Sequence, residues 1–81
     1  MAIRIQWISG DISTADTWSD LLQNMGQVQN PPISGQEMKS ILATRTRRWG
    51  SVIASPDLPN EQFFGLMEQA GMVTIIEGNE R

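Results

Sequence analysis

The chain of 81 residues contains no cysteine, no histidine and no tyrosine. Without cysteine it can form neither a disulfide nor a thiolate zinc site. Without all three residue types it also lacks the usual general bases and thiol nucleophiles, so that carboxylates would have to perform any acid–base chemistry. We therefore expect a protein that is not an enzyme, has no catalytic residues and uses no cofactor.

Long apolar runs and an excess of positive charge are missing as well. No segment approaches the about 20 consecutive apolar residues of a membrane-spanning helix, and residues 1–11 alternate in polarity where a secretory signal has a continuous apolar segment. Six Lys and Arg against nine Asp and Glu give a net charge of −3 at pH 7, which weakens long-range attraction to DNA and to anionic lipid. These features predict a cytoplasmic protein that does not bind membranes.

Two segments have the pattern of β-strands. Ile3, Ile5 and Trp7 alternate with polar residues, as in a half-buried strand. Residues 72–78 are rich in β-branched side chains and predict a second strand, followed by a frayed tail at about residues 78–81. Because two isolated strands are marginal, we expect these two to pair under a layer of helices. Residues 51–55 are too few to be assigned, and remain either a third strand or an extension of the preceding helix.

Three helices are predicted between the strands, at about residues 14–25, 35–49 and 60–70. Ser34 and Glu37 fit the S-x-x-E capping box, which places the start of the second helix at Gly35. Each helix has a predicted capping side chain at its start and a glycine at its end: Ser13 with Asp16 and Gly26 for the first, Ser34 and Gly50 for the second, Asp57 or Asn60 and Gly71 for the third. The chain is therefore predicted to be a single small α+β domain over residues 1–81, with the order strand, three helices, strand and a two- or three-stranded sheet covered by helices.

The middle helix has an unusual apolar stripe. The first and third helices carry apolar residues at i, i+3, i+4 and i+7: Trp18, Leu21, Leu22 and Met25, and Phe63, Leu66, Met67 and Ala70. The same spacing in the middle helix gives Met38, Ile41 and Leu42, followed by Arg45 and, one turn later, Trp49. A charged side chain thus falls in the middle of the stripe that is predicted to face the core.

Arg45 can be interpreted in three ways. Its methylenes could line the edge of the core while the guanidinium pairs with Asp20 or Glu61. Alternatively, Arg45 and Trp49 are exposed together, as residues of the two types most enriched in binding hot spots. The third alternative is that the helix fails near Thr44 and Thr46, which are weak helix formers. The second interpretation predicts a partner-binding surface of Arg45, Trp49, Arg48 and Phe64, where Phe64 either widens the core face of its helix or is exposed.

Four of the six basic residues lie within residues 39–50, which raises the alternative of nucleic-acid binding. On one straight helix the four do not share a face, whereas a recognition helix presents its basic side chains together. This alternative assigns Lys39, Arg47 and Arg48 as solvent-exposed nucleic-acid contacts. The segment LMEQAGMVTIIEGNER, residues 66–81, resembles the recognition helix and first wing strand of a winged-helix regulator, and that resemblance implies a small nucleic-acid-binding regulator.

Neither the acidic nor the methionine residues predict a separate site. Asp16 and Asp20 are spaced i, i+4 on the predicted first helix, but they face away from its apolar stripe and have no third ligand nearby, so no metal site is expected. Met25, Met38 and Met67 occupy stripe positions and are expected to fill the core.

The function that these observations favour is binding to a protein or protein complex. We expect a domain that acts by occupying a partner surface, of the kind with which phages or mobile elements inhibit a host enzyme or nucleic-acid complex, and that would then work in the host cytoplasm. Two alternatives remain: the winged-helix type of regulator, and a self-assembling structural subunit that forms homo-oligomers through its strand edges.

Overall fold

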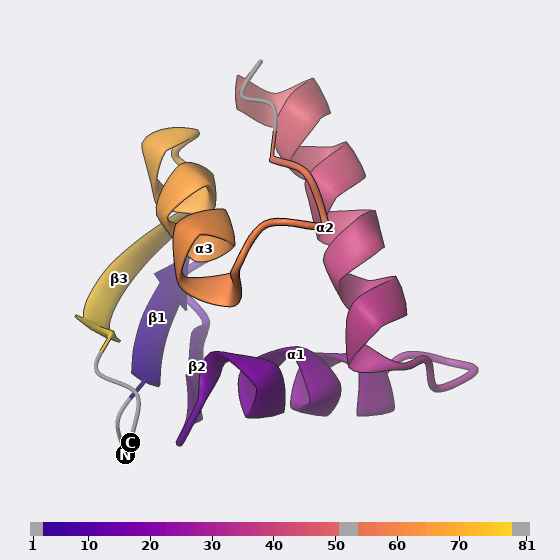
Figure 1. Ribbon diagram of the computed structural model, residues 1–81. Coiled ribbons are helices and arrows are strands. Elements are labelled where there is room, and N and C mark those ends of the chain that lie inside the picture. The colour runs from indigo at the N-terminus through magenta and orange to yellow at the C-terminus, as the bar shows by residue number, and fades with distance from the viewer. Residues whose placement is uncertain (1–2, 51–53, 79–81) are drawn as a thin grey trace.

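The structure is a computed structural model that describes residues 3–50 and 54–78 (Figure 1). Its elements follow the order β1 (Ile3–Trp7), β2 (Ile12–Ala15), α1 (Trp18–Gln27), α2 (Gly35–Gly50), α3 (Asn60–Gln69) and β3 (Val73–Gly78). The predicted α+β class is confirmed. None of the helices in the described residues has the length and apolar character needed to cross a membrane.

The sheet is antiparallel, with the strand order β2-β1-β3. The first and last strands pair as predicted, with Ile5 opposite Ile75 and Trp7 opposite Val73. The third strand is β2, whose residues were predicted to contain the cap and the first two positions of the first helix. Residues 51–53 lie outside the described residues, and Ala54 and Ser55 belong to neither a strand nor a helix. Of the tail predicted from about residue 78, Gly78 belongs to β3 and the rest is likewise outside the described residues.

The predicted start of the first helix is wrong. Residues 12–15 instead extend from a tight turn and pair with β1, because the backbone groups of β1 gain partners there. Ser13 does not cap a helix, and its hydroxyl accepts a hydrogen bond from Trp7 Nε1 at 2.9 Å. The residue that caps α1 is Thr17, whose side-chain oxygen accepts from the Asp20 amide at 3.1 Å.

Two of the other predicted helix ends need correction. Gly26 is not a left-handed cap but lies within α1, where any side chain would collide with the backbone carbonyl of Ile33. α3 begins without a side-chain cap, and the Asn60 amide instead donates to Ser19 Oγ of α1 at 3.2 Å. At the other end of α3, Gly71 has the predicted left-handed conformation, with φ of 84°.

The start of α2 agrees with its sequence signal. The Ser34 hydroxyl accepts a hydrogen bond from the Glu37 amide at 3.1 Å, and α2 begins at Gly35 as predicted. The described part of the helix ends at Gly50, and a side chain at Gly50 would collide with Ala70 at the end of α3. Gly50 therefore allows the last turn of α2 to lie against α3.

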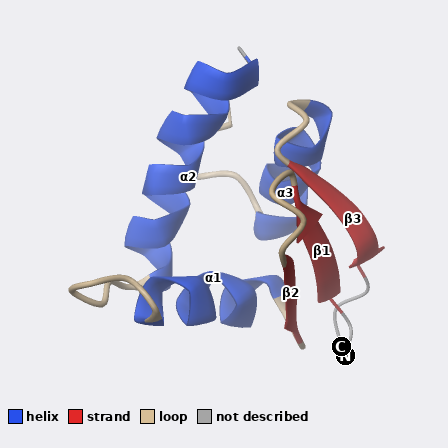
Figure 2. Cartoon of the chain, turned by 180° about the vertical axis from the view of Figure 1, so that it is seen from behind, coloured by secondary structure: helices blue, strands red, loops and turns tan. Residues whose placement is uncertain are grey.

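The helices gather on one side of the sheet. α3 lies over the strands, α1 crosses below it, and α2 stands beyond α3 at a steep angle to α1 (Figure 1, Figure 2). The core between them is aromatic, since Trp18 stacks on Phe64 at 4.7 Å between ring centroids and Phe63 meets Phe64 edge-on at 5.9 Å. The predicted apolar stripes of α1 and α3 face this core, and Met25, Met38 and Met67 help to fill it.

The cap of α2 gives the first prediction. Ser34→Ala should lower the free energy of unfolding by about 0.5–2 kcal/mol, because the Glu37 amide loses its acceptor. Ser40→Ala is the matched control, since Ser40 is exposed in mid-helix and should change stability by about 0.5 kcal/mol or less. Urea unfolding of both variants measures the difference, and equal losses would show that Ser34 does not act as a cap.

Candidate functional site

α2 turns a different face to the core from the one that its apolar stripe predicts. Its buried residues are Met38, Lys39, Leu42, Ala43 and Thr46. The buried face is turned about the helix axis from the predicted apolar stripe. The angle between the two faces is somewhat smaller than the angle of about 100° between successive residues. Ile41 and Arg45 therefore lie towards solvent. The exposure of Arg45 agrees both with the interpretation at the edge of the core and with that of a binding surface, since Arg45 borders a hollow together with the buried Met38 and Leu42.

The rotation depends in part on Lys39, which the sequence analysis placed on the solvent-facing flank. Only 6% of Lys39 is exposed, its ammonium donates a hydrogen bond to the Leu58 carbonyl, and it lies 5.4 Å from the centre of the Phe63 ring. Burial lowers the pKa of Lys39, while the nearby Asp57 carboxylate acts to raise it. The prediction that Lys39 is a solvent-exposed nucleic-acid contact is wrong, because its side chain is buried and its ammonium donates to the Leu58 carbonyl within the fold.

Thr46 is the second polar residue on the buried face of α2. It is fully buried, and its hydroxyl donates to the Leu42 carbonyl one turn earlier at 2.7 Å. The same oxygen lies 3.1 Å from the sulfur of Met72, next to β3. A threonine that satisfies its hydroxyl within its own helix can enter a core at little cost, and the helix does not fail at this point.

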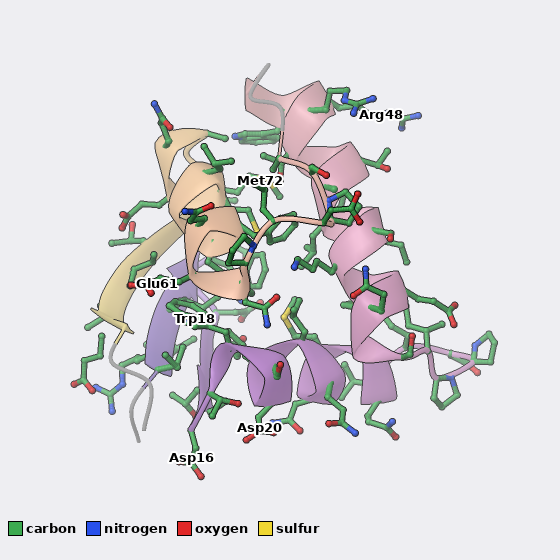
Figure 3. The ribbon with its side chains drawn as sticks, in the orientation of Figure 1. Asp16, Trp18, Asp20, Arg48, Glu61 and Met72 are labelled. Carbon is green, nitrogen blue, oxygen red and sulfur yellow. The ribbon has the colours of Figure 1, made fainter. Side chains whose placement is uncertain are left out.

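Towards its end, α2 presents Arg45, Arg48 and Trp49 beside the turn that follows α3. Trp49 is 60% exposed, and both arginines are exposed. These three residues and Met72 line a hollow of about 290 Å³. Arg48 projects from the last turns of α2, whereas Asp20 and Glu61 lie on other parts of the molecule (Figure 3). Neither acidic residue forms an ion pair with Arg45 within the part of the chain that the structure describes.

A second hollow, of about 410 Å³, adjoins the first and shares Arg45 with it. It lies between the turn after β1, the end of α1 and the middle of α2. Ile8 and Val28, which are 66% and 80% exposed, stand at this hollow. We call the combined surface the arginine groove and define it by Ile8, Val28, Arg45, Arg48, Trp49 and Met72.

The sequence analysis missed three members of the groove. Ile8 follows a strand and precedes a turn, Val28 stands alone between glutamines, and Met72 sits between Gly71 and β3. Val28 is an isolated apolar residue, Ile8 adjoins the first predicted strand and Met72 belongs to the last one, and single exposed apolar residues are common on protein surfaces. Only the packing of α2 beside them shows that they adjoin Arg45 and Trp49.

Phe64 does not belong to the arginine groove. It is fully buried and stacks on Trp18, so the prediction that it contacts a partner is wrong. The reason is that α3 lies in the angle between the sheet and α1, which buries two neighbouring faces of the helix and takes up both Phe63 and Phe64. Of the predicted partner-binding residues, the structure brings Arg45, Arg48 and Trp49 together.

The predicted nucleic-acid residues do not gather in one place. Lys39 is buried, Arg48 belongs to the arginine groove, and Arg47 is exposed but lines neither of its hollows. Asp16 precedes α1, so it does not form the helical pair with Asp20, and it points away from the body of the molecule (Figure 3). Among the residues described, no three acidic or other metal-binding side chains lie close enough to hold an ion.

Comparison of the chain with protein-family models, with curated proteins and with solved structures finds no match. Its function is therefore inferred from the surface described above.

The burial of Lys39 gives the second prediction. Lys39→Ala should lower the free energy of unfolding by about 1–3 kcal/mol, because the partly buried Leu58 carbonyl loses its donor. Arg47→Ala, which removes an exposed charge from the same helix, should change stability by about 0.5 kcal/mol or less. Thermal melting of the two variants compares them, and equal melting temperatures would show that Lys39 contributes nothing to the fold.

The lowered pKa of Lys39 adds a pH dependence to the same measurement. In the unfolded chain Lys39 keeps its proton up to its ordinary value of 10.5, whereas the folded chain releases it at lower pH. As pH rises towards 10.5 the unfolded state thus binds more protons, and the free energy of unfolding rises. The wild type should gain stability relative to Lys39→Ala over this alkaline interval, and parallel pH curves would contradict the shift.

The opposite placements of Phe64 and Trp49 give the third prediction. Phe64→Ala should cost about 3–5 kcal/mol, because Phe64 is fully buried between Trp18 and Phe63. Trp49→Ala should cost about 1 kcal/mol at most, since most of that side chain faces solvent. Denaturant unfolding distinguishes the two, and comparable losses would place Trp49 in the core.

Proposed function

We propose that this chain is a small non-catalytic protein-binding domain that acts by occupying a surface of a partner protein with its arginine groove. The observation that carries the proposal is the exposure of Trp49 beside Arg45 and Arg48 over one hollow. Trp and Arg dominate binding hot spots, which lie where large side chains meet a concave, desolvated surface. Trp49 lies near Gly71 and Met72, but most of its side chain is exposed and available to an interface.

The distribution of exposed apolar side chains supports the same function. Six large apolar side chains of the described residues are exposed, and three of them, Ile8, Val28 and Trp49, stand at the arginine groove. Single exposed apolar residues need no explanation, but a group around a hollow with a polar rim is typical of protein interaction sites. Arg45 and Arg48 supply that rim.

The size of the hollows favours a protein segment over a small molecule. Volumes of about 290 and 410 Å³ lie at the lower end of the about 300–1,000 Å³ of small-molecule sites. The smaller hollow is lined by two arginines, a tryptophan and a methionine, which are long or adaptable side chains. Such a lining suits the side chains of a partner protein.

The strand edges support self-assembly less well than the groove supports binding. The Glu68 carboxylate accepts a hydrogen bond from the Ile75 amide at 2.7 Å, and so occupies a backbone group that an added strand would need. At the other edge β2 has only four residues, Ile12–Ala15. Short and blocked edges are means by which proteins avoid edge-to-edge pairing.

A domain of this type inhibits its partner when the covered surface is one that the partner needs. Its small size and the lack of cysteine, histidine and tyrosine support a blocking role over a catalytic one. We therefore extend the proposal to inhibition of a host enzyme or nucleic-acid complex by a phage or mobile element.

Capture of the partner tests the proposal and gives the fourth prediction. The tagged chain is used to isolate partners from lysate of its source cells, and the affinity of each purified partner is then measured for the wild type and for single variants. Trp49→Ala and Arg45→Ala should each weaken binding by about 2 kcal/mol, which is about 30-fold. Arg47→Ala is the matched control and should bind as the wild type does, since Arg47 lies outside the groove.

Three results would contradict the proposal. A partner that binds Trp49→Ala and Arg45→Ala as tightly as the wild type would not use the arginine groove. Weaker binding that follows a lower melting temperature would assign both residues to the fold. Captured material that is lost on nuclease treatment, and whose binding falls steeply with salt and with Arg47→Ala, would favour the nucleic-acid alternative.

A further inference from the structure

We propose that the arginine groove receives a short acidic amphipathic segment of the partner protein, with carboxylates at Arg45 and Arg48 and a large apolar side chain in the hollow of Trp49 and Met72. This inference rests on the proposed function and adds the chemistry of the partner. It is argued from the charge, the lining and the direction of the groove.

The charge of the groove is opposite to that of the chain. The net charge is −3, yet the two charged side chains that line the smaller hollow are both arginines. Neither has an acidic partner within the described part of the chain. Guanidinium groups bind carboxylates through two parallel hydrogen bonds, which makes exposed arginines at a hollow complementary to acidic residues.

The spacing of the arginines matches two acidic residues on one face of a helix. Arg45 and Arg48 are separated by about one turn of α2, which is about 4.5 Å along the helix axis. Acidic residues three or four positions apart on a partner helix present their carboxylates at a similar spacing. A helix lying along α2 could thus place one carboxylate at each guanidinium, as in other complexes in which an amphipathic helix lies in a groove.

Because part of the groove's lining is apolar, carboxylates alone do not make a partner segment complementary to it. Trp49 offers a large exposed ring, and Met72, whose sulfur contacts Thr46, also lines the hollow. Burying such a ring against an apolar side chain contributes more binding energy than exposed ion pairs, whose median contribution is about 0–1 kcal/mol. The proposed segment must therefore carry an apolar residue beside its carboxylates.

The two ends of the groove differ, which gives the segment a direction. The larger hollow is bordered by Asp11, whose carboxylate accepts a hydrogen bond from Ser9 Oγ at 3.1 Å, and by the exposed Ile8 and Val28. A carboxylate next to Asp11 would be repelled. The acidic part of the segment therefore lies at Arg48 and Arg45, and its apolar part extends towards Ile8 and Val28.

Defined peptides test this chemistry and give the fifth prediction. Three labelled peptides of about 15 residues, long enough for partial helicity, are compared by fluorescence anisotropy with the intact chain. The first is an acidic amphipathic helix, the second has lysine in place of each glutamate, and the third is a scrambled acidic sequence of the same composition. The first should bind about tenfold more tightly than either of the others.

A pair of adjacent substitutions provides the matched control. Arg48→Glu places a negative charge at the hollow, whereas Arg47→Glu makes the same change of charge at a residue outside it. Arg48→Glu should weaken the acidic peptide about tenfold and strengthen the lysine peptide, and Arg47→Glu should do neither. Trp49→Ala should weaken the acidic peptide without altering the preference between the charged forms.

Several outcomes would overturn the inference. In the peptide experiment, these are equal binding of the acidic and lysine peptides or no binding of any peptide. Equal effects of Arg47→Glu and Arg48→Glu on binding would also contradict it, as would tighter binding of a labelled oligothymidylate than of the acidic peptide. Occupation of the groove by a second copy would instead appear as a concentration-dependent mass that Arg48→Glu abolishes.

Capture of the cellular partner distinguishes a failure of the acidic-segment inference from a failure of the proposed function. If capture of the cellular partner is lost in Trp49→Ala but kept in Arg48→Glu, the groove binds a protein and the acidic assignment is wrong. If neither variant affects capture, the proposed function itself is wrong.

Discussion

The position of the arginine groove depends on the burial of Lys39. Its ammonium is held between the Leu58 carbonyl and the ring of Phe63, so that the first turns of α2 face the loop before α3 and α3 itself. Thr46, two turns further on, continues the same face towards Met72. With Lys39 and Thr46 directed inwards, Arg45 and Arg48 are turned towards solvent, and Trp49, two turns after the buried Leu42, is exposed at the end of the helix. A polar interaction inside the fold thus determines which residues are available outside it.

The two ends of α2 limit its remaining freedom. At its start, the Ile33 amide donates to the carbonyl of Gly26 at 3.0 Å, and the missing side chain of Gly26 lets the incoming loop lie against α1. At its other end, Gly50 lies against Ala70 of α3. These are backbone approaches that a single added methyl group would disturb. Together with the rotation of α2, these approaches place Arg45, Arg48 and Trp49 beside Met72, and these four residues form the hollow.

The sequence predicted the features that depend on local chemistry. These include the alternation of β1, the Ser34 cap, the left-handed Gly71 and the apolar faces of α1 and α3, each of which is encoded within a few neighbouring residues. Most of the failures originate in contacts between residues that are distant in the sequence. β2 forms because β1 offers it a hydrogen-bonding edge. In the sequence, the composition of residues 12–15 and the turn before them indicate a strand less strongly than Ser13 indicates a helix cap. Lys39 and Thr46 enter the core because Leu58 and Leu42 provide acceptors, which no count of apolar residues can detect.

The same reasoning explains why Arg45 was ambiguous and why the groove was only partly found. A helical stripe of Met38, Ile41, Leu42, Arg45 and Trp49 reads as a core face when apolar character is the only criterion. The structure instead assigns Met38 and Leu42 to the core and leaves Ile41, Arg45 and Trp49 towards solvent. Ile41, Arg45 and Trp49 fit the predicted apolar stripe but are exposed, so they are available to pack against another molecule. The residues of α2 that the core uses therefore differ from those that it leaves exposed, and the exposed ones are available to the proposed partner without loss of the core.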